Sequence, residues 1–270
     1  MTVYGRKPVL EALADGGLVV DKVLLADNAR GPAVREILDA AAGRGVPVRR
    51  ASAHRVKVLA GNGRHDQGVL ADVVAPRMRP LAAFLASAAD AADVSGAADA
   101  AGAAGAAGSG PASVLVLDQI TNPANVGMIL RTATAAGLDG VVLPRRGVPG
   151  VDPLVVKASA GVAFHAPVLR CATAAQACAA LSAAGFSLYG LTADAPHSVF
   201  TAPLPDRAAF VLGNETSGVS DQVRAAVDGW LSIPMTGGVE SLNVASAAAV
   251  LCFELVRRRS ARSPALPLAE

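Results

Sequence analysis

The stretch SIPMTGGVESLNVASAAAVLCFELVRRR, from Ser232 to Arg259, decides the fold of the C-terminal half. A short apolar strand end is followed by a polar turn and then by a long apolar helix pattern. Gly237 and Gly238 let the turn's backbone approach a ligand closely. Ser241 and Asn243 stand where a helix start needs capping groups. The pattern predicts a strand-to-helix corner, where ligands commonly bind in α/β proteins.

Two further stretches have the same arrangement, which helix capping alone does not require. Polar residues crowd between an apolar strand pattern and a helix pattern in VLVLDQITNPANVGMILRTATAAG, from Val114 to Gly137. They do so again in FVLGNETSGVSDQV, from Phe210 to Val223. The sequence therefore predicts that three distant corners form one composite site.

Composition bounds the class of protein. The chain has 270 residues, of which 52% are hydrophobic, so it can bury a sizeable core and is not disordered as a whole. Its net charge is only +2, from 24 basic and 22 acidic residues. Any binding of nucleic acid must therefore come from local clusters of charge.

The cysteines and the N-terminus indicate a compartment. Cys171, Cys178 and Cys252 lie in apolar surroundings without the paired spacing of a zinc site. We expect buried thiols in a reducing compartment and no metal. Charges interrupt the apolar run at the N-terminus, and no run reaches the roughly 18 apolar residues of a membrane span. These features predict a soluble cytoplasmic protein.

Composition also divides the chain. Residues 1–80 alternate helix and strand patterns, with strands expected at Lys22 to Ala26, Val46 to Arg50 and Gly68 to Val74, which predicts a compact α/β unit. Residues 81–112 are rich in Ala and Gly and are predicted to be a flexible linker, with a helix that packs Phe84 and Leu85 as the alternative for its first part, LAAFLASAADAADV. Residues 113–270 alternate again. Their strands lack period-two alternation, which favours a mainly parallel sheet covered on both faces.

Basic residues recur at the ends of elements in the N-terminal unit, where they either contact RNA phosphates or form an ordinary solvated surface. The candidates are Arg6, Lys7, Arg49, Arg50, Arg55, Lys57, Arg64 and His65, with Gln67 able to hydrogen bond.

Three side chains in the corners are candidates for chemistry. Arg131 stands among apolar helix residues, so we expect it to be partly buried and to reach the same cleft as Asn125. Glu215 lies in the Gly-bounded loop over residues 213–218, where the alternative role is loop capping.

The three corners, taken together, resemble the three motifs of the SpoU/TrmH group of SPOUT-class RNA ribose methyltransferases. The similar patterns are N-P-x-N-x-G-x-x-x-R-T-A, G-N-E-x-x-G and I-P-M-x-G-x-x-x-S-L-N-V-A, and KASAG over residues 157–161 also looks like a family segment. At the N-terminus, YGRKPVLEAL and DQGVLADV resemble the L30e-like RNA-binding domain of members that modify large-subunit ribosomal RNA.

The resemblance implies a fold and a reaction. An L30e-like domain over residues 1–80 would precede a SPOUT domain over 113–270, which has a mainly parallel sheet and a deep trefoil knot and pairs into a homodimer. The implied reaction moves a methyl group from S-adenosylmethionine to a ribose 2′-hydroxyl. The favoured substrate is a guanosine in 23S ribosomal RNA. The alternatives are transfer RNA, a base nitrogen, or a non-catalytic RNA-binding or assembly factor.

The resemblance also assigns residues by matching motif positions. The implied catalytic residues are Asn125, Arg131, Glu215, Ser241 and Asn243. The implied RNA-binding residues are Arg6, Lys7, Arg64, Gln67 and Arg131. The implied cofactor-binding residues are Leu191, Thr192, Leu212, Gly213, Asn214, Glu215, Gly218, Ile233, Pro234, Met235, Ser241, Leu242, Asn243 and Ala245.

The role of Arg131 has two versions. The resemblance implies that Arg131 activates the ribose 2′-hydroxyl, but a guanidinium is a poor proton acceptor. We favour the version in which Arg131 stabilises the forming alkoxide and another group takes the proton. The C-terminal arginines, Arg257, Arg258, Arg259 and Arg262, either touch RNA or form a charge cluster at the helix end.

Overall fold

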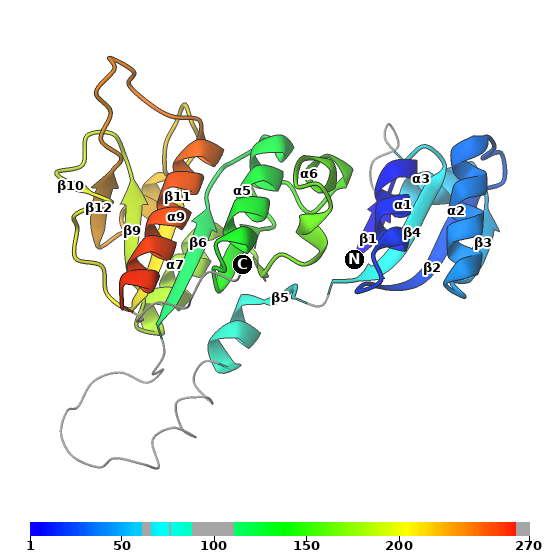
Figure 1. The fold of residues 1–270 in the computed structure, drawn as a ribbon, viewed down its shortest axis with the longest axis horizontal. Coiled ribbons are helices and arrows are strands. Elements are labelled where there is room, and N and C mark those ends of the chain that lie inside the picture. The colour runs from blue at the N-terminus through cyan, green and yellow to red at the C-terminus, as the bar shows by residue number, and fades with distance from the viewer. Residues whose placement is uncertain (61–65, 76, 88–110, 263–270) are drawn as a thin grey trace, which may run out of the picture.

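The computed structural model describes residues 1–60, 66–75, 77–87 and 111–262, and these fold into two α/β units (Figure 1). The N-terminal unit has a four-stranded sheet and the C-terminal unit an eight-stranded sheet. The α/β class predicted from the sequence is confirmed. Within the described ranges, no helix has both the length and the apolar character needed to cross a bilayer.

The N-terminal sheet has the strand order β1-β4-β2-β3. β2 (Val19–Ala26) and β3 (Val48–Ala51) are parallel, and β3 forms one edge of the sheet. β4 (Val69–Val74) pairs antiparallel with β2 and with β1 (Thr2–Tyr4). The short strand β1 was not predicted, because three residues carry no measurable alternation.

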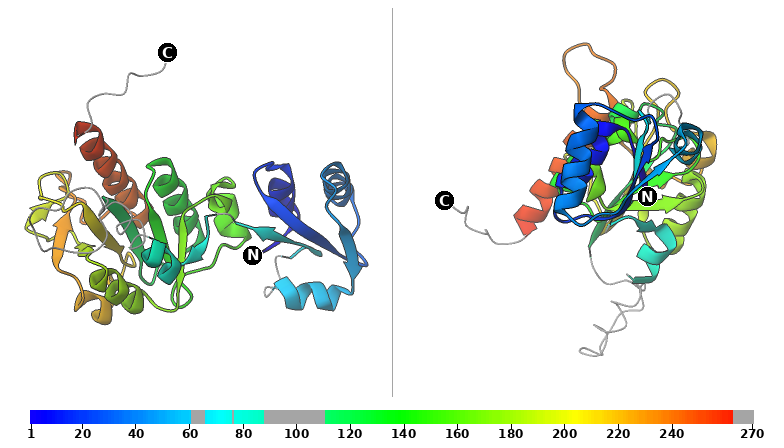
Figure 2. Two further views of the ribbon diagram at one scale, coloured as in Figure 1. Left: turned by 90° about the horizontal axis from the view of Figure 1, so that it is seen from below. Right: turned by 90° about the vertical axis from the view of Figure 1, so that its right-hand side faces the viewer.

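Three helices cover this sheet unequally. α1 (Arg6–Ala14) and α2 (Pro32–Gly43) lie together on one face, whereas α3 (Ala53–Ala60) lies alone on the other (Figure 2). Val23 and Leu25 of β2 and Ile37 of α2 are fully buried. One face of the sheet is therefore closed by two helices, and the other is only partly closed by one.

The C-terminal sheet has the strand order β10-β12-β9-β11-β6-β7-β8-β5, and every neighbouring pair is parallel. This confirms the predicted mainly parallel sheet, whereas the trefoil knot stays a prediction. The two edge strands have two residues each, too few to show a sequence pattern. The strands are β5 (Arg79–Pro80), β6 (Ala112–Leu117), β7 (Gly140–Pro144), β8 (Val168–Cys171), β9 (Ser187–Leu191), β10 (His197–Ser198), β11 (Arg207–Leu212) and β12 (Gly229–Ser232).

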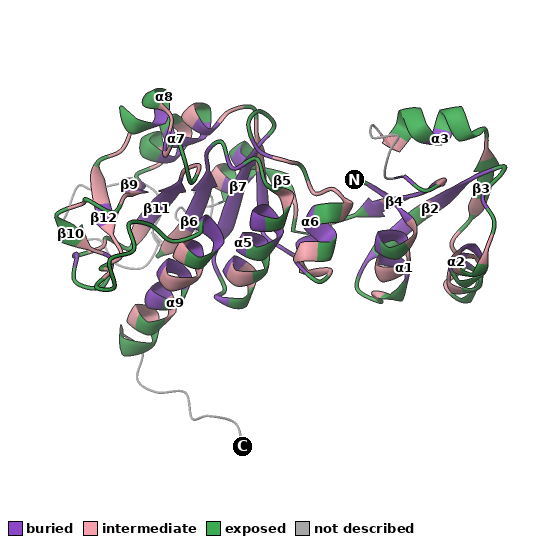
Figure 3. Ribbon diagram, turned by 90° about the horizontal axis from the view of Figure 1, so that it is seen from above, coloured by how far each residue is buried: buried purple, intermediate pink, exposed green. Residues whose placement is uncertain are grey.

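Helices cover both faces of this sheet, as the unbroken apolar strands require (Figure 3). α5 (Pro123–Ala135) and α9 (Val244–Arg262) pack side by side on one face. α7 (Ala174–Ala183) and α8 (Asp221–Arg224) lie on the opposite face. The buried stripe of α9 consists of Val244, Ala245, Ala248, Leu251, Cys252 and Leu255.

The segment between the units begins as part of the C-terminal unit. β5 pairs with β8, and residues 81–87 are helical, with Leu81 and Phe84 in the core on the α7 side of the sheet. Residues 88–110 of the predicted linker lie outside the described residues. The domain boundaries proposed from the sequence stay predictions.

The cysteines are only partly as expected. Cys178 and Cys252 are buried, and burial raises the pKa of each thiol to about 12. Cys171 is half-buried, which corrects the prediction of three buried thiols. Its position at the carboxyl end of β8 leaves one side open.

α6 (Pro153–Ala158) and the 3-10 turn η1 (Val162–Phe164) join the two units. Val156 and Phe164 are fully buried and belong to the hydrophobic core of the N-terminal unit. On the other side, α6 packs closely on α5, because a Cβ at Gly127 would lie 2.6 Å from the carbonyl oxygen of Val155. The junction therefore connects the N-terminal core to the helix that carries Asn125 and Arg131.

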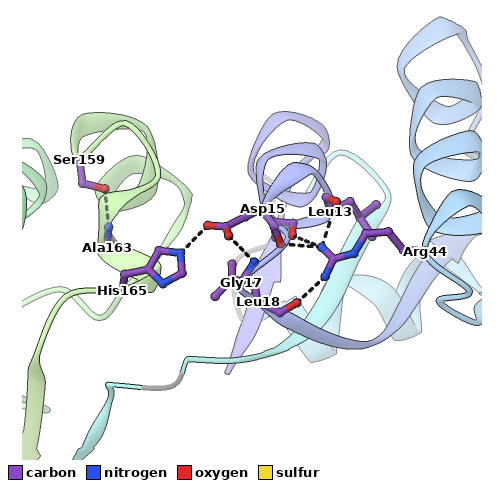
Figure 4. A network of polar contacts seen from close by, with 9 residues as sticks. Leu13, Asp15, Gly17, Leu18, Arg44, Ser159, Ala163 and His165 are labelled. Carbon is purple, nitrogen blue, oxygen red and sulfur yellow. Dashed lines mark hydrogen bonds and ion pairs between the residues drawn. The ribbon is translucent and has the colours of Figure 1, made fainter.

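A polar contact completes the junction (Figure 4). His165 Nε2 hydrogen bonds to the Asp15 carboxylate, and the Gly17 amide donates to the same side chain at 3.0 Å. Arg44 donates to the Leu13 carbonyl near the end of α1 and to the Leu18 carbonyl just before β2. Burial alone would raise the pKa of Asp15, but the hydrogen bonds from His165 and Gly17 outweigh it and lower the pKa.

The junction predicts an acid-dependent loss of stability. A carboxyl group whose pKa is lowered on folding stabilises the protein above its ordinary pKa, here 3.8, and that contribution is lost as the pH falls through the lowered value. Asp15→Asn should therefore reduce the free energy of unfolding at pH 7, and the gap to wild type should close below pH 3.8. Urea unfolding across pH measures this. Asp39→Asn, an exposed carboxylate on α2, is the control. A constant gap at every pH would contradict the assignment.

Candidate functional site

Parallel pairing brings the three corners to one edge of the C-terminal sheet. β12, β9, β11 and β6 are consecutive neighbours, so their carboxyl ends lie side by side. The corner after β6 leads into α5, the corner after β11 into α8, and the corner after β12 into α9. Sequence segments more than 100 residues apart therefore meet at this edge, as ligand sites do in open α/β sheets.

A pocket of about 390 Å³ opens at this edge. Its walls combine apolar side chains with the main chain and polar side chains of two loops, the usual make-up of a small-molecule site. Its lining consists of Leu191, Thr192, Ala193, Leu212, Gly213, Asn214, Glu215, Thr216, Ser217, Gly218, Leu231, Ile233, Met235, Ser241, Leu242, Val244 and Ala247.

Three amide and carboxylate side chains join the corners beside the pocket. Asn125, which is only 2% exposed, donates from Nδ2 to Glu215 Oε1 at 2.5 Å. Asn243 donates from Nδ2 to Asn125 Oδ1 at 3.1 Å and to the same Glu215 oxygen at 3.3 Å. Each residue comes from a different corner. The cluster therefore fixes the three corners relative to one another.

Local capping explains why these residues stand where the helices begin. Asn122 caps α5 by accepting from the Ala124 amide at 2.9 Å, and Pro123 occupies the first turn. Asn243 accepts from the Ala245 amide at 2.9 Å and so caps α9. Asn243 thus caps a helix and binds the cluster at once, and its catalytic and cofactor-binding roles stay predictions.

The loop from Gly213 to Gly218 closes on itself. The amides and carbonyls of Asn214 and Gly218 exchange two hydrogen bonds of 2.9 Å, and the Asn214 side chain accepts from the Thr216 and Ser217 amides. A Cβ at Gly213 would lie only 2.4 Å from the carbonyl carbon of Gly218. Only glycine therefore fits at Gly213 in this loop.

Two family models match the chain. Residues 112–253 match the SpoU rRNA methylase family, and residues 2–79 match a model described as RNA 2′-O ribose methyltransferase substrate binding. The chain belongs to the SpoU rRNA methylase family. The resemblance drawn from the three motifs is thereby confirmed.

Individual relatives of this SpoU methylase match over nearly the whole chain. A 23S rRNA (guanosine-2′-O-)-methyltransferase RlmB from Xanthomonas axonopodis pv. citri is 34% identical over 95% of this chain and 96% of its own. The SpoU methyltransferase AviRb from Streptomyces viridochromogenes, solved with the cofactor AdoMet, is 25% identical and covers 97% of this chain and 91% of its own, with a TM-score of 0.61.

A third comparison matches only part of the SpoU methylase. A structure concerned with 2-OH methylation of C/U34 on tRNA is 30% identical, with a TM-score of 0.50. It covers 57% of this chain and 100% of its own. That protein thus matches little more than half of this chain, whereas RlmB and AviRb match both units.

Most residues implied as cofactor-binding line the pocket of this SpoU methylase, and three do not. Pro234, Asn243 and Ala245 stand beside the lining, because Asn243 turns toward Asn125 and Ala245 is buried in α9. Ser241 is exposed at the rim. Six lining residues were missed. Thr216 and Ser217 lie inside the motif already singled out, and Ala247 follows Asn243 by one helical turn, so spacing alone could have found them.

Arg131 corrects a sequence prediction. It is exposed, not partly buried, and it does not line the pocket of its own chain. Six residues along a helix turn the side chain by about 240°, so Arg131 and Asn125 project to different sides of α5. Within the described residues, its guanidinium has no hydrogen-bond or ion-pair partner. The apolar neighbours misled the prediction because they belong to the buried side of the helix.

The implied RNA-binding residues of the N-terminal unit are partly described. Arg6 is half-buried at the start of α1, where its main-chain N–H donates to Gln67 Oε1 at 3.1 Å. Lys7 is exposed beside it. Arg64 lies outside the described residues, as does His65.

The C-terminal arginines are largely structural. Arg258 donates to the carbonyls of Val199 and Ala202, and Arg259 donates to the carbonyls just after the end of α5. Arg257 and Arg258 also bind the buried carboxylate of Glu254, and these hydrogen bonds hold its pKa below the ordinary value. Among the described side chains, this favours the helix-end charge cluster over RNA contact for Arg258 and Arg259. The Arg262 side chain is outside the described set.

Proposed function

We propose that this protein transfers a methyl group from S-adenosylmethionine to the ribose 2′-hydroxyl of a guanosine in 23S ribosomal RNA. The observation that carries the proposal is the cluster of Asn125, Glu215 and Asn243, which ties three motif corners to one pocket. The relative named RlmB, similar over both units, supports the choice of reaction and RNA.

The pocket fits the cofactor by its chemistry. Its volume lies in the range of small-molecule sites, and Leu212, Ile233 and Leu242 offer an apolar surface for a purine ring. The loop over residues 213–218 offers main-chain polar groups at the rim. S-Adenosylmethionine supplies, when bound, a methyl group activated by its sulfonium. AviRb, solved with AdoMet, supports the assignment.

The chain's own residues position the reacting groups. A ribose hydroxyl is a weak nucleophile until its proton leaves or its oxygen is stabilised, and alignment with the methyl group contributes much of the rate. Asn125 and Asn243 place both amides on Glu215, so the carboxylate is held and the pocket keeps its shape. Ser241 at the rim is free to hydrogen bond the incoming ribose.

We infer that Arg131 acts on a second copy of the chain. It does not line its own pocket, and it stands on the outer side of α5 beside the exposed Met128. Phe253 on the adjacent α9 is 53% exposed. These apolar side chains support a homodimer through α5 and α9, in which each Arg131 stabilises the forming alkoxide at the partner's pocket.

The N-terminal unit supports ribosomal RNA over transfer RNA. The structure concerned with tRNA methylation covers 57% of this chain, whereas the RlmB relative covers 95% of it and so spans both units. The intact cluster of Asn125, Glu215 and Asn243 speaks against an assembly factor without catalysis. We place the reaction in the cytoplasm, because its proposed substrate is ribosomal RNA.

Mapping of 2′-O-methyl groups tests the proposal. Ribosomal and transfer RNA from a strain lacking the protein should lose one 2′-O-methylguanosine in 23S RNA and regain it when the wild-type chain is restored. The Asn243→Ala chain should restore less, because the cluster loses its link to α9. Loss of a mark in transfer RNA alone, or of a base methyl group, would contradict the proposed substrate.

A further inference from the structure

A second hollow, larger than the cofactor pocket, lies on the N-terminal unit. Its volume is about 620 Å³, and it is built entirely from residues before position 73. No residue of the cofactor pocket contributes to it. Its lining consists of Thr2, Lys22, Leu24, Arg49, Arg50, Ala51, Ser52, Arg55, Leu59, Leu70 and Asp72.

The hollow exists because α3 covers its face of the sheet incompletely. Strand registers place Thr2 opposite Asp72, Leu24 opposite Leu70 and Leu24 beside Arg49. Paired residues point to the same face. Because Arg55 and Leu59 of α3 line the same hollow, this face is the one that α3 covers. α3 anchors to it through the fully buried Val56. Residues of the edge strand β3 line the hollow beside it.

The charges in this hollow are unequally balanced. Asp72 is already bound, by Lys22 at 2.8 Å and by the Thr2 hydroxyl at 2.9 Å. Among the described residues, no carboxylate lies within 4.0 Å of the guanidinium groups of Arg49, Arg50 or Arg55. Arg50 makes only long contacts of 3.3 and 3.4 Å to main-chain carbonyls at the end of β2.

The hollow concentrates positive charge in a nearly neutral chain. Lys22, Arg49 and Arg55 against Asp72 leave a formal charge of +2 in this one hollow, as much as the +2 of the whole protein. A concave surface lined by one sign of charge focuses the field on a ligand. Arginine also matches phosphate oxygens in a forked geometry that lysine lacks. The lining therefore selects a ligand with phosphate groups.

We propose that this hollow binds the phosphodiester backbone of the RNA substrate, away from the nucleotide that is methylated. The inference rests on the proposed function and adds to it the surface and the chemistry of recognition. The lining includes three consecutive residues of the edge strand β3, Arg49, Arg50 and Ala51. Arginines spaced along a sheet edge suit a chain of phosphates better than one small anion. Arg6 and Gln67, implied as RNA-binding by the motifs, do not line the hollow. Phosphate contacts of this kind fix the register of an RNA but do not read its sequence.

The test is RNA binding by an Arg49→Ala/Arg55→Ala variant of the full chain. The probe is protein-free 23S ribosomal RNA from a strain lacking the protein, and binding is measured without cofactor at several salt concentrations. We expect affinity to fall about 10- to 100-fold and the slope of log Kd against log salt to drop by about 2, because two phosphate contacts are lost.

Matched variants test whether an effect comes from the hollow or from loss of positive charge in general. Arg35→Ala/Arg77→Ala removes two exposed arginines that do not line the hollow, and it should bind RNA as wild type does. Arg49→Lys/Arg55→Lys should recover most of the affinity, because phosphate accepts a point charge. Binding of S-adenosylmethionine should be unchanged in every variant, since the two sites share no residue.

Two results would overturn the inference. One is wild-type RNA affinity and salt slope in Arg49→Ala/Arg55→Ala. The other is saturation of the hollow by pyrophosphate with no effect of the double variant on RNA binding, which would make it a small-anion site. Because the assay needs no methyl transfer, it reports on the hollow even if the proposed reaction proves wrong.

Discussion

Arg131→Ala is expected to slow methyl transfer about 100- to 1000-fold, the usual cost of removing one donor to a developing oxyanion. Affinity for S-adenosylmethionine should change by less than about threefold, because Arg131 does not line its own pocket. Single-turnover methyl transfer to 23S ribosomal RNA gives the rate, and calorimetry gives the affinity. Arg131→Lys keeps the positive charge but loses the forked geometry of the guanidinium, so its rate of methyl transfer should lie between those of wild type and Arg131→Ala.

Mixing two inactive chains tests where Arg131 acts. One chain carries Arg131→Ala, and the other carries Ala247→Trp, which fills the pocket. In a dimer that contains one chain of each variant, one pocket is intact and faces the intact Arg131 of the other chain. Random exchange makes about half of the dimers mixed, so about a quarter of all sites should be active. Each chain alone should be inactive. No recovery on mixing would show that Arg131 acts within its own chain or not at all, and near-normal turnover of Arg131→Ala would remove it from the mechanism.

Gly213→Ala is expected to abolish cofactor binding, raising the Kd for S-adenosylmethionine about 100-fold or more. The added Cβ would lie 2.4 Å from the Gly218 carbonyl carbon and 2.5 Å from its oxygen, and main-chain atoms cannot yield without opening the loop. The loop forms one wall of the pocket, so methyl transfer should be lost in parallel. Calorimetry with the purified chain measures the loss.

Gly237→Ala is the matched control for Gly213→Ala. Gly237 lies in the loop after β12, where no atom stands within 4 Å of an added Cβ. We expect its Kd for the cofactor to stay within about twofold of wild type. Equal losses in both variants would mean that loop flexibility, not the close approach of Gly213 to Gly218, governs binding.

The sequence predicted the site well where local patterns coincide with parallel strand order. Asn125, Glu215 and Asn243 follow buried strands, and the carboxyl ends of neighbouring parallel strands meet at one edge, so their convergence could be expected. Gly213 also stood out, although only the structure shows which backbone it approaches. The motif resemblance added what periodicity does not carry, namely the reaction and the cofactor.

Other features depend on contacts that no local pattern encodes. The exposure of Arg131 follows from which side of α5 packs against the sheet, and both sides carry apolar residues. The junction of Asp15 with His165 joins residues 150 positions apart. The basic hollow required α3 to leave part of a sheet face uncovered, which the spacing of Arg49 and Arg55 does not predict.

The most direct test of the central claim uses purified protein, S-adenosylmethionine with a deuterated methyl group, and unmodified 23S ribosomal RNA. Nuclease digestion and mass spectrometry locate the label. If the three corners form one pocket for this reaction, the wild-type chain should label a single guanosine, with the heavy methyl group on its 2′-oxygen. The Gly213→Ala chain should give no label. Label on a base, or none with the wild-type chain, would contradict the account.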